Sequence, residues 1–99
     1  MSKGLPVRER TVEQHLVNAL EKCGLPCIKY ANAASGMPDR LVLLPGGRVW
    51  WVELKTQGGV LSDLQKYQHQ KLRQLGHNVS VVWSIAQADE LVRSLTDIR

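Results

Sequence analysis

The sequence has no uninterrupted apolar run of the roughly 18 residues that a membrane span needs, and its first ten residues have no apolar core like that of a signal peptide. Cysteine is scarce: the two copies, Cys23 and Cys27, have no second pair to complete a zinc site. A glycine-rich phosphate loop is also missing. These absences exclude membrane-spanning and disulfide-framed proteins and argue against a nucleotide-binding protein. They predict a cytoplasmic protein with free thiols and no membrane partner.

The composition is that of one small globular domain, which we expect to span residues 1–99. Apolar residues make up 43% of the chain and charged residues 22%, which excludes a disordered tail. The formal net charge of +4 suits a polyanionic partner without identifying one. The three histidines, His15, His69 and His77, lack the spacing of a metal-binding helix, so we assign none of them as a ligand.

Apolar periodicity predicts three helices. Apolar residues recur every three or four positions from about Glu9, and Gly24 then offers a C-terminal stop. A Ser-x-x-Gln capping box at 62–65 begins a second helix, which ends at Gly76. A third helix carries the apolar residues up to Ile98.

Four segments rich in strand-forming residues complete the pattern, and they cover residues 27–31, 40–44, 48–55 and 79–83. Pro45-Gly46-Gly47 separates the second segment from the third and is typical of a hairpin turn. The element order is therefore αβββαβα. It predicts an α/β fold in which a mixed sheet, with the hairpin strands at its centre, is flanked by helices.

Glu53 and Lys55 form the most informative pair of charges. Strand side chains alternate, so residues two apart project from the same face. The surrounding run is otherwise apolar, and unpaired charges in a buried strand cost several kcal/mol or shift their pKa. For an isolated Glu-x-Lys, a salt-bridged strand end near solvent is the more common explanation. The neighbouring residues must therefore decide whether the pair has a function.

Asp39 supplies that context, because it stands directly before the preceding hairpin strand. Asp39 and Glu53 lie at nearly equal distances from the Gly46–Gly47 turn, so an antiparallel ladder brings them across from each other. Two carboxylates at that separation repel, and a cation relieves the repulsion. Oxygen-only ligands suit Mg²⁺ or Mn²⁺, so the pair predicts a metal site.

Pro38-Asp39 followed by Glu53-Leu54-Lys55 resembles the PD-(D/E)xK pattern of restriction-endonuclease-like nucleases. Further segments are similar to the VRR-NUC branch of that superfamily, in its stand-alone phage and bacterial form, and they are residues 36–39, 52–55, 58–65 and 75–76. The resemblance covers nearly the whole chain. It implies a restriction-endonuclease-like αβββαβ(α) core.

The resemblance also implies a site. The catalytic residues would be Asp39, Glu53, Lys55, Glu13 and Gln65, and the metal ligands would be Asp39, Glu53, Glu13 and the carbonyl of Leu54. Glu9 is the alternative to Glu13, because residues four apart share a helix face. Gln65 has a second explanation, since the capping box already accounts for a glutamine there. Basic residues that could contact phosphates are Lys29, Arg40, Lys66, Lys71 and Arg73.

The implied activity is hydrolysis of DNA phosphodiester bonds with one or two Mg²⁺ or Mn²⁺ ions, and Lys55 would assist the attacking water. Stand-alone members of the family resemble junction-resolving homodimers, so the expected substrate is branched or four-way-junction DNA. Trp50, Trp51 and Trp83 are candidate anchors for a dimer interface, although we expect each of them to pack in the core. The alternative is a non-catalytic nucleic-acid-binding or assembly module on the same fold.

Overall fold

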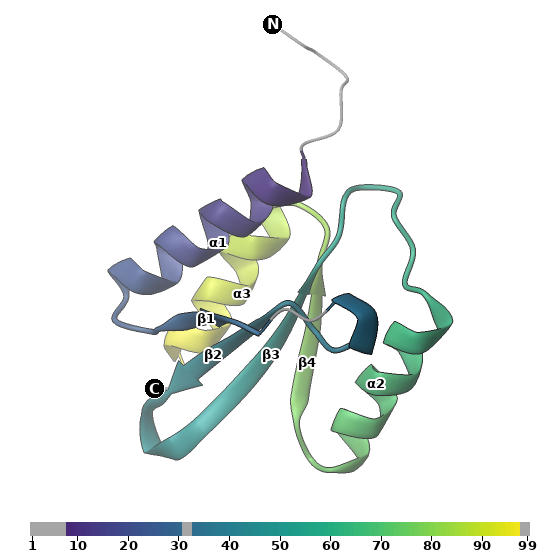
Figure 1. Ribbon diagram of the computed structural model, residues 1–99. Helices are drawn as coiled ribbons and strands as arrows, with labels where there is room; N and C mark the ends of the chain where they lie inside the picture. Colours follow the sequence, from purple (N-terminus) through teal and green to yellow (C-terminus); the bar gives the residue numbers. More distant parts are fainter. Residues whose placement is uncertain (1–7, 31–32, 98–99) are drawn as a thin grey trace, which may run out of the picture.

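The computed structural model describes residues 8–30 and 33–97 and has the expected α/β architecture (Figure 1). In chain order its elements are α1 (Glu9–Lys22), β1 (Cys27–Lys29), β2 (Arg40–Leu44), β3 (Arg48–Leu54), α2 (Asp63–Gln74), β4 (Asn78–Val82) and α3 (Ile85–Asp97). Short 3-10 turns occupy Ala33–Ser35 and Pro45–Gly47. The predicted order of helices and strands is confirmed. The expected extension of the first strand to Ala31 and the third helix's Ile98 lie outside the described residues.

The four strands form one mixed sheet in the order β1-β2-β3-β4. The first three strands are antiparallel, and β4 runs parallel to β3. The hairpin strands β2 and β3 are therefore central, as predicted. Gly46 and Gly47 both adopt positive φ angles, of 78° and 74°, which side chains other than glycine tolerate poorly. These two glycines allow the chain to reverse between β2 and β3.

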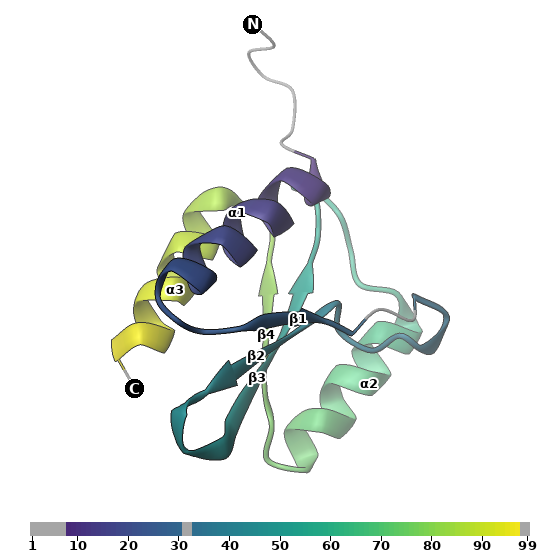
Figure 2. The same cartoon turned by 60° about the vertical axis from the view of Figure 1, so that its left-hand side comes forward.

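Helices cover both faces of the sheet: α1 and α3 lie together on one face and α2 lies on the other (Figures 1 and 2). The larger core lies under α1 and α3, where Leu16 and Leu95 are fully buried against Val52. A smaller core beneath α2 contains Trp51, Leu72 and Val79. Because strand side chains alternate, Trp51 and Glu53 face α2, while Val52 and Leu54 face the larger core. Within the described part of the chain, no helix has the length and apolarity to cross a membrane.

The predicted helix boundaries have the expected local causes. Ser62 and Gln65 form both hydrogen bonds of the capping box at the start of α2. Gly24 and Gly76 follow the ends of α1 and α2 with φ angles of 76° and 91°. The amides of Leu25 and His77 then bond back to the carbonyls of Leu20 and Leu72, which closes both helices with the Schellman pattern.

Candidate functional site

Asp39 and Glu53 meet at the end of the central hairpin that lies opposite its turn. The ladder pairs Arg40 with Val52, so the next positions outward are Asp39 and Glu53. The amide of Leu54 donates a hydrogen bond to Asp39 Oδ2 at 2.8 Å, which fixes this carboxylate against β3. The Glu53 side chain is 2% exposed. The alignment predicted from the turn position is therefore present, and it places two carboxylates at one sheet end.

The approach of Asp39 to this end depends on a close contact between the preceding loop and helix α2. Gly36 has a φ of 73°, and a Cβ atom built on it would lie 2.6 Å from Leu64 Cγ. Pro38 is fully buried. A side chain at position 36 would push the loop away from α2, so glycine sets the path of the chain into Asp39.

The Asp39 carboxyl favours the protonated form of Glu53. The pKa of Glu53 is raised from 4.5 to about 8, first by burial and then by the hydrogen bond and the charge of the adjacent Asp39 carboxyl, while Lys55 opposes the shift. Without a cation, the neutral form of Glu53 is therefore favoured near pH 7. A divalent cation would replace that proton as the compensating positive charge.

The structure separates the two candidate helical acids. Glu13 Oε2 accepts a hydrogen bond from Arg40 Nε at 2.8 Å, so Glu13 forms an ion pair with a residue at the start of β2. Glu9 lies one turn earlier, at the start of α1, and its pKa is affected by the charges of Asp39 and Lys55. Partial burial raises the pKa of Glu9, the charge of Asp39 raises it further, and Lys55 lowers it. The structure thus brings Glu9 into the field of the site and engages Glu13 elsewhere.

Helix α2 contacts Glu53 through two residues. Gln65 Oε1 accepts from the Ser62 amide at 2.9 Å as part of the capping box, while Gln65 Nε2 lies 3.4 Å from Glu53 Oε2. Gln65 therefore completes the capping box and also lies beside Glu53. His69 Nε2 lies 3.1 Å from Glu53 Oε1, and the His69 side chain is 1% exposed.

The sequence does not decide whether His69 borders the site. A signal for it existed, because it stands four residues after Gln65 and hence on the same helix face. Burial lowers the pKa of His69, and the charge of Arg73 lowers it further, while Asp39 opposes the shift. The ring is therefore neutral at pH 7. Its Nδ1 atom is buried and has no hydrogen-bond partner among the described residues.

The predicted phosphate-contacting residues fall into two groups. Lys29, Lys66 and Lys71 are exposed. Arg40 bonds to Glu13 and also donates to the Cys27 carbonyl at 3.1 Å, and Arg73 donates to the Val79 carbonyl at 2.9 Å. The three lysines and Arg73 are therefore exposed, with Lys71 Nζ 5.8 Å from the centre of the Tyr67 ring, while Arg40 is mostly buried.

Among residues 8–30 and 33–97, no three His, Cys, Asp or Glu side chains gather into a ready-made metal-binding cluster. The donor set nevertheless fits a hard divalent cation, because Mg²⁺ is commonly held by one or two carboxylates with water and substrate oxygens completing its shell. Asp39 and Glu53 supply two such carboxylates. In the absence of a cation, a site that favours positive charge would bind a proton. The raised pKa of Glu53 fits this expectation.

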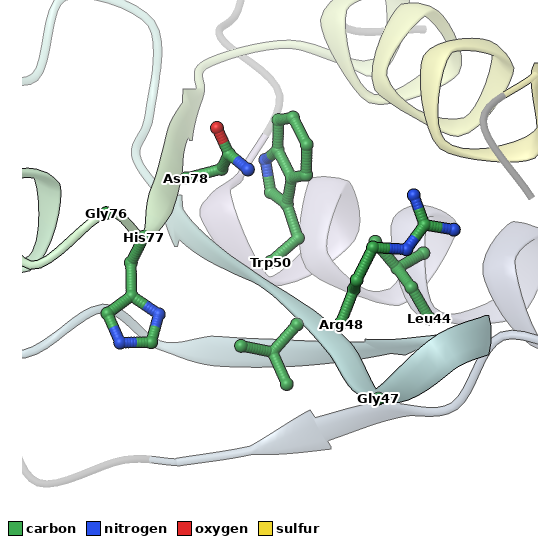
Figure 3. A pocket seen from close by; sticks show the side chains of 8 residues that line it. Leu44, Gly47, Arg48, Trp50, Gly76, His77 and Asn78 are labelled. Atoms are coloured by element: carbon green, nitrogen blue, oxygen red, sulfur yellow. The ribbon is translucent and has the colours of Figure 1, made fainter.

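A separate cleft of about 280 Å³ lies at the other end of β3 (Figure 3). Its lining includes Arg48 and Trp50 from the first half of β3, together with His77 and Asn78 where the chain enters β4. None of the predicted catalytic residues lines it. The carboxylate pair and this cleft are therefore distinct features at opposite ends of the central strand.

Known proteins provide an independent comparison. The sequence matches the VRR-NUC domain family over residues 6–85, a range that includes Asp39, Glu53 and Lys55. A protein named "Putative nuclease p44", from Acyrthosiphon pisum secondary endosymbiont phage 1, is 39% identical over 77 residues, which are 77% of this chain and 83% of that protein. A solved structure titled "VRR_NUC domain" is 34% identical and superposes with a TM-score of 0.77, covering 86% of this chain and 94% of the other. The chain therefore belongs to the VRR-NUC domain family.

Proposed function

We propose that this protein is a divalent-metal-dependent DNA endonuclease that prefers branched DNA and resolves four-way junctions as a homodimer. The observation that carries the nuclease proposal is the convergence of Asp39 and Glu53 at one sheet end, with Lys55 close enough to oppose the pKa shift of Glu53. The relative named as a nuclease supports the same reaction class.

In this proposal, Asp39, Glu53 and the Leu54 carbonyl hold one or two Mg²⁺ or Mn²⁺ ions. The Leu54 amide keeps Asp39 in place by donating to its Oδ2 atom. When bound, the cation would lower the pKa of the attacking water and neutralise charge that develops on the phosphate. Glu9 is the acidic side chain of α1 that we assign to the site, in preference to Glu13, because Glu13 is paired with Arg40.

Lys55 supplies the positive charge of the protein itself. Its backbone amide donates to the Val82 carbonyl at 2.9 Å, which extends the contact between β3 and β4 by one residue. The side chain is half-buried beside the carboxylates. An ammonium there can orient the attacking water and stabilise negative charge in the transition state.

DNA would be held chiefly through its phosphates. Lys29, Lys66 and Lys71 are exposed and carry charges complementary to the backbone, so binding should weaken as salt concentration rises. Such contacts position the duplex without reading its sequence. Arg40 and Arg73 have structural partners within the chain and are assigned a lesser part in binding.

A homodimer would give two cutting sites, as a symmetric junction requires. The tryptophans are used inside the chain: Trp51 is buried, Trp50 donates to Ser80, and Trp83 donates to the Gly59 carbonyl. Exposed apolar side chains on α2 are better candidates for the contact, and they are Leu64 and Tyr67 at 45% and 56% exposure. We also propose that residues 1–99 form a single domain, because α1 and α3 share one core. This domain would act on DNA in the cytoplasm.

A panel of labelled DNA structures tests the function. Single-stranded, nicked, flapped and four-way-junction DNA are incubated with Mn²⁺ or with chelator, using the native protein and the variants Asp39→Asn, Glu53→Gln and Glu21→Gln. We expect cleavage of the junction that requires Mn²⁺ and is lost in the first two variants. Glu21 is exposed at the far end of α1, so its variant should cut normally. Junction binding without cleavage would favour the non-catalytic module.

Light scattering of the same samples addresses the oligomeric state. A homodimer at micromolar concentration is expected. A strict monomer that nevertheless cuts DNA would overturn the proposal of junction resolution while leaving the nuclease assignment in place.

A further inference from the structure

Both carboxylate oxygens of Glu53 are contacted by side chains of α2 that lie one helical turn apart. Gln65 Nε2 is 3.4 Å from Oε2, close to the limit for a hydrogen bond, and Gln65 is also tied to Ser62 by the capping box. His69 Nε2 is 3.1 Å from Oε1, and both partners are almost fully buried. The shorter, drier contact is therefore the one made by His69.

Burying a histidine at position 69 costs free energy, because both ring nitrogens lose their hydrogen bonds to water. A neutral imidazole has one donor and one acceptor nitrogen, and the buried Nδ1 atom of His69 has no partner within residues 8–30 and 33–97. Leu72, one turn later on the same helix, belongs to the apolar cluster beneath α2. An aliphatic side chain at position 69 could join that cluster without burying an unpaired nitrogen. The bond to Glu53 is the feature that accounts for a histidine at this position.

The direction of the bond follows from the surroundings. If Nε2 carries the hydrogen, Nδ1 is an unpaired acceptor, whereas the other tautomer would leave a buried N–H without a partner, which is rarer in proteins. The geometry thus favours donation from His69 Nε2 to Glu53 Oε1. The Glu53 carboxyl is then restrained from the side of α2 and adjoins Asp39 on its other side.

We propose that His69 is a positioning residue: its Nε2–H group donates to Glu53 Oε1 and fixes the orientation in which Glu53 can share a cation with Asp39. This inference rests on the proposed metal-dependent function and adds a residue that acts through a ligand without touching the metal. Hydrogen-bond partners of metal-binding side chains commonly change metal affinity by about 10- to 100-fold when they are removed.

The test compares replacements that keep or move the donor. In His69→Gln the side-chain amide nitrogen takes the approximate place of Nε2, in His69→Asn it takes that of Nδ1, and His69→Leu has no donor. Calorimetric titration with Mn²⁺ in the absence of DNA measures affinity, and thermal unfolding in chelator shows that each variant is folded. Gln70→Ala, an exposed change on the same helix, is the control.

We expect His69→Leu and His69→Asn to bind Mn²⁺ at least tenfold more weakly, and His69→Gln to stay within about threefold of the native protein. Native affinity in folded His69→Leu would overturn the proposal. Equal losses in His69→Gln and His69→Leu would do so as well, because the donor would then not be the cause.

A second measurement does not depend on metal or on nuclease activity. Nitrogen-detected NMR of the histidine rings in chelator at pH 7 should show the hydrogen of His69 on Nε2, and a hydrogen on Nδ1 would contradict the proposed donation. If Mn²⁺ binding follows the expected order but no DNA is cut, the proposed nuclease function fails and the positioning role stands. If the native protein takes up no Mn²⁺, both are wrong.

Discussion

Asp39 and Glu53 occupy the first position beyond the paired residues Arg40 and Val52, so the two carboxylates lie across from each other at the open end of the β2–β3 hairpin. The Leu54 amide holds Asp39 from the sheet side, and His69 contacts Glu53 from the side of α2. The acidic pair is therefore restrained by two different layers of the fold. Its chemistry can be tested separately from the stability of either layer.

The first prediction concerns Lys55, whose charge acts on both Glu53 and Glu9. Replacing it by methionine, a side chain of similar length, should lower the rate of DNA cleavage by about 100-fold, since loss of one group that stabilises transition-state charge commonly costs that much. Mn²⁺ affinity should not fall, because a cation near the metal is removed. Single-turnover cleavage and calorimetry measure the two quantities. Lys22→Met, an exposed change at the end of α1, is the matched control, and weaker Mn²⁺ binding in Lys55→Met would contradict this assignment.

The second prediction concerns pH. The folded pKa of Glu53 is raised from an ordinary 4.5 to about 8, so folding favours its neutral form. The stability from this group is fully present below about pH 4.5 and is lost as the pH rises toward 8. Melting temperatures in chelator should accordingly fall over this interval, and Mn²⁺ should restore much of the loss at pH 8.

Glu53→Gln is the control for the pH effect, because its side chain does not titrate in this range. The variant should show a smaller decline in melting temperature between pH 5 and pH 8 and little stabilisation by Mn²⁺. An identical pH profile in the variant and the native protein would mean that another group causes the decline.

The sequence allowed the strand register of the site to be predicted, because turn glycines and strand spacing are local properties. The same is true of the capping box at Ser62 and Gln65, which α2 forms as expected. The orientation of α2 was less accessible. Leu64 and Leu75 are 45% and 72% exposed, while His69 is buried beside Glu53. Which face of a short helix meets the sheet depends on tertiary packing. The contact between His69 and Glu53 could therefore not be predicted from the sequence.

The sequence could not distinguish Glu9 from Glu13 for a related reason. Both lie on one face of α1, so periodicity treats them alike. The difference arises because Arg40, at the start of β2, reaches Glu13 and bonds to it. That contact joins residues far apart in sequence and depends on how α1 lies over the sheet.

The third prediction separates these two acids. Glu9→Gln should weaken Mn²⁺-dependent cleavage by about tenfold and leave the melting temperature nearly unchanged, because Glu9 is largely exposed. Glu13→Gln should lower the melting temperature, since it removes the partner of a mostly buried Arg40 guanidinium, and should reduce cleavage less. Cleavage assays and thermal unfolding on the same samples measure both effects. A larger loss of cleavage in Glu13→Gln would return the helical acid to that position.

The fourth prediction concerns the loop that leads into Asp39. Gly36→Ala introduces a Cβ atom 2.6 Å from Leu64 Cγ and 2.9 Å from the Leu64 backbone, at a φ of 73°. Gly24→Ala has a similar φ of 76°, but its Cβ atom would meet nothing within 4 Å in the part of the chain that the structure describes, so it carries the conformational penalty without the clash. We expect Gly24→Ala to destabilise the fold by about 1 kcal/mol and Gly36→Ala by clearly more, with weaker Mn²⁺ binding in the second variant alone. Chemical unfolding and calorimetry compare the two. If both variants lose the same stability and bind Mn²⁺ equally well, the contact between this loop and α2 does not position Asp39.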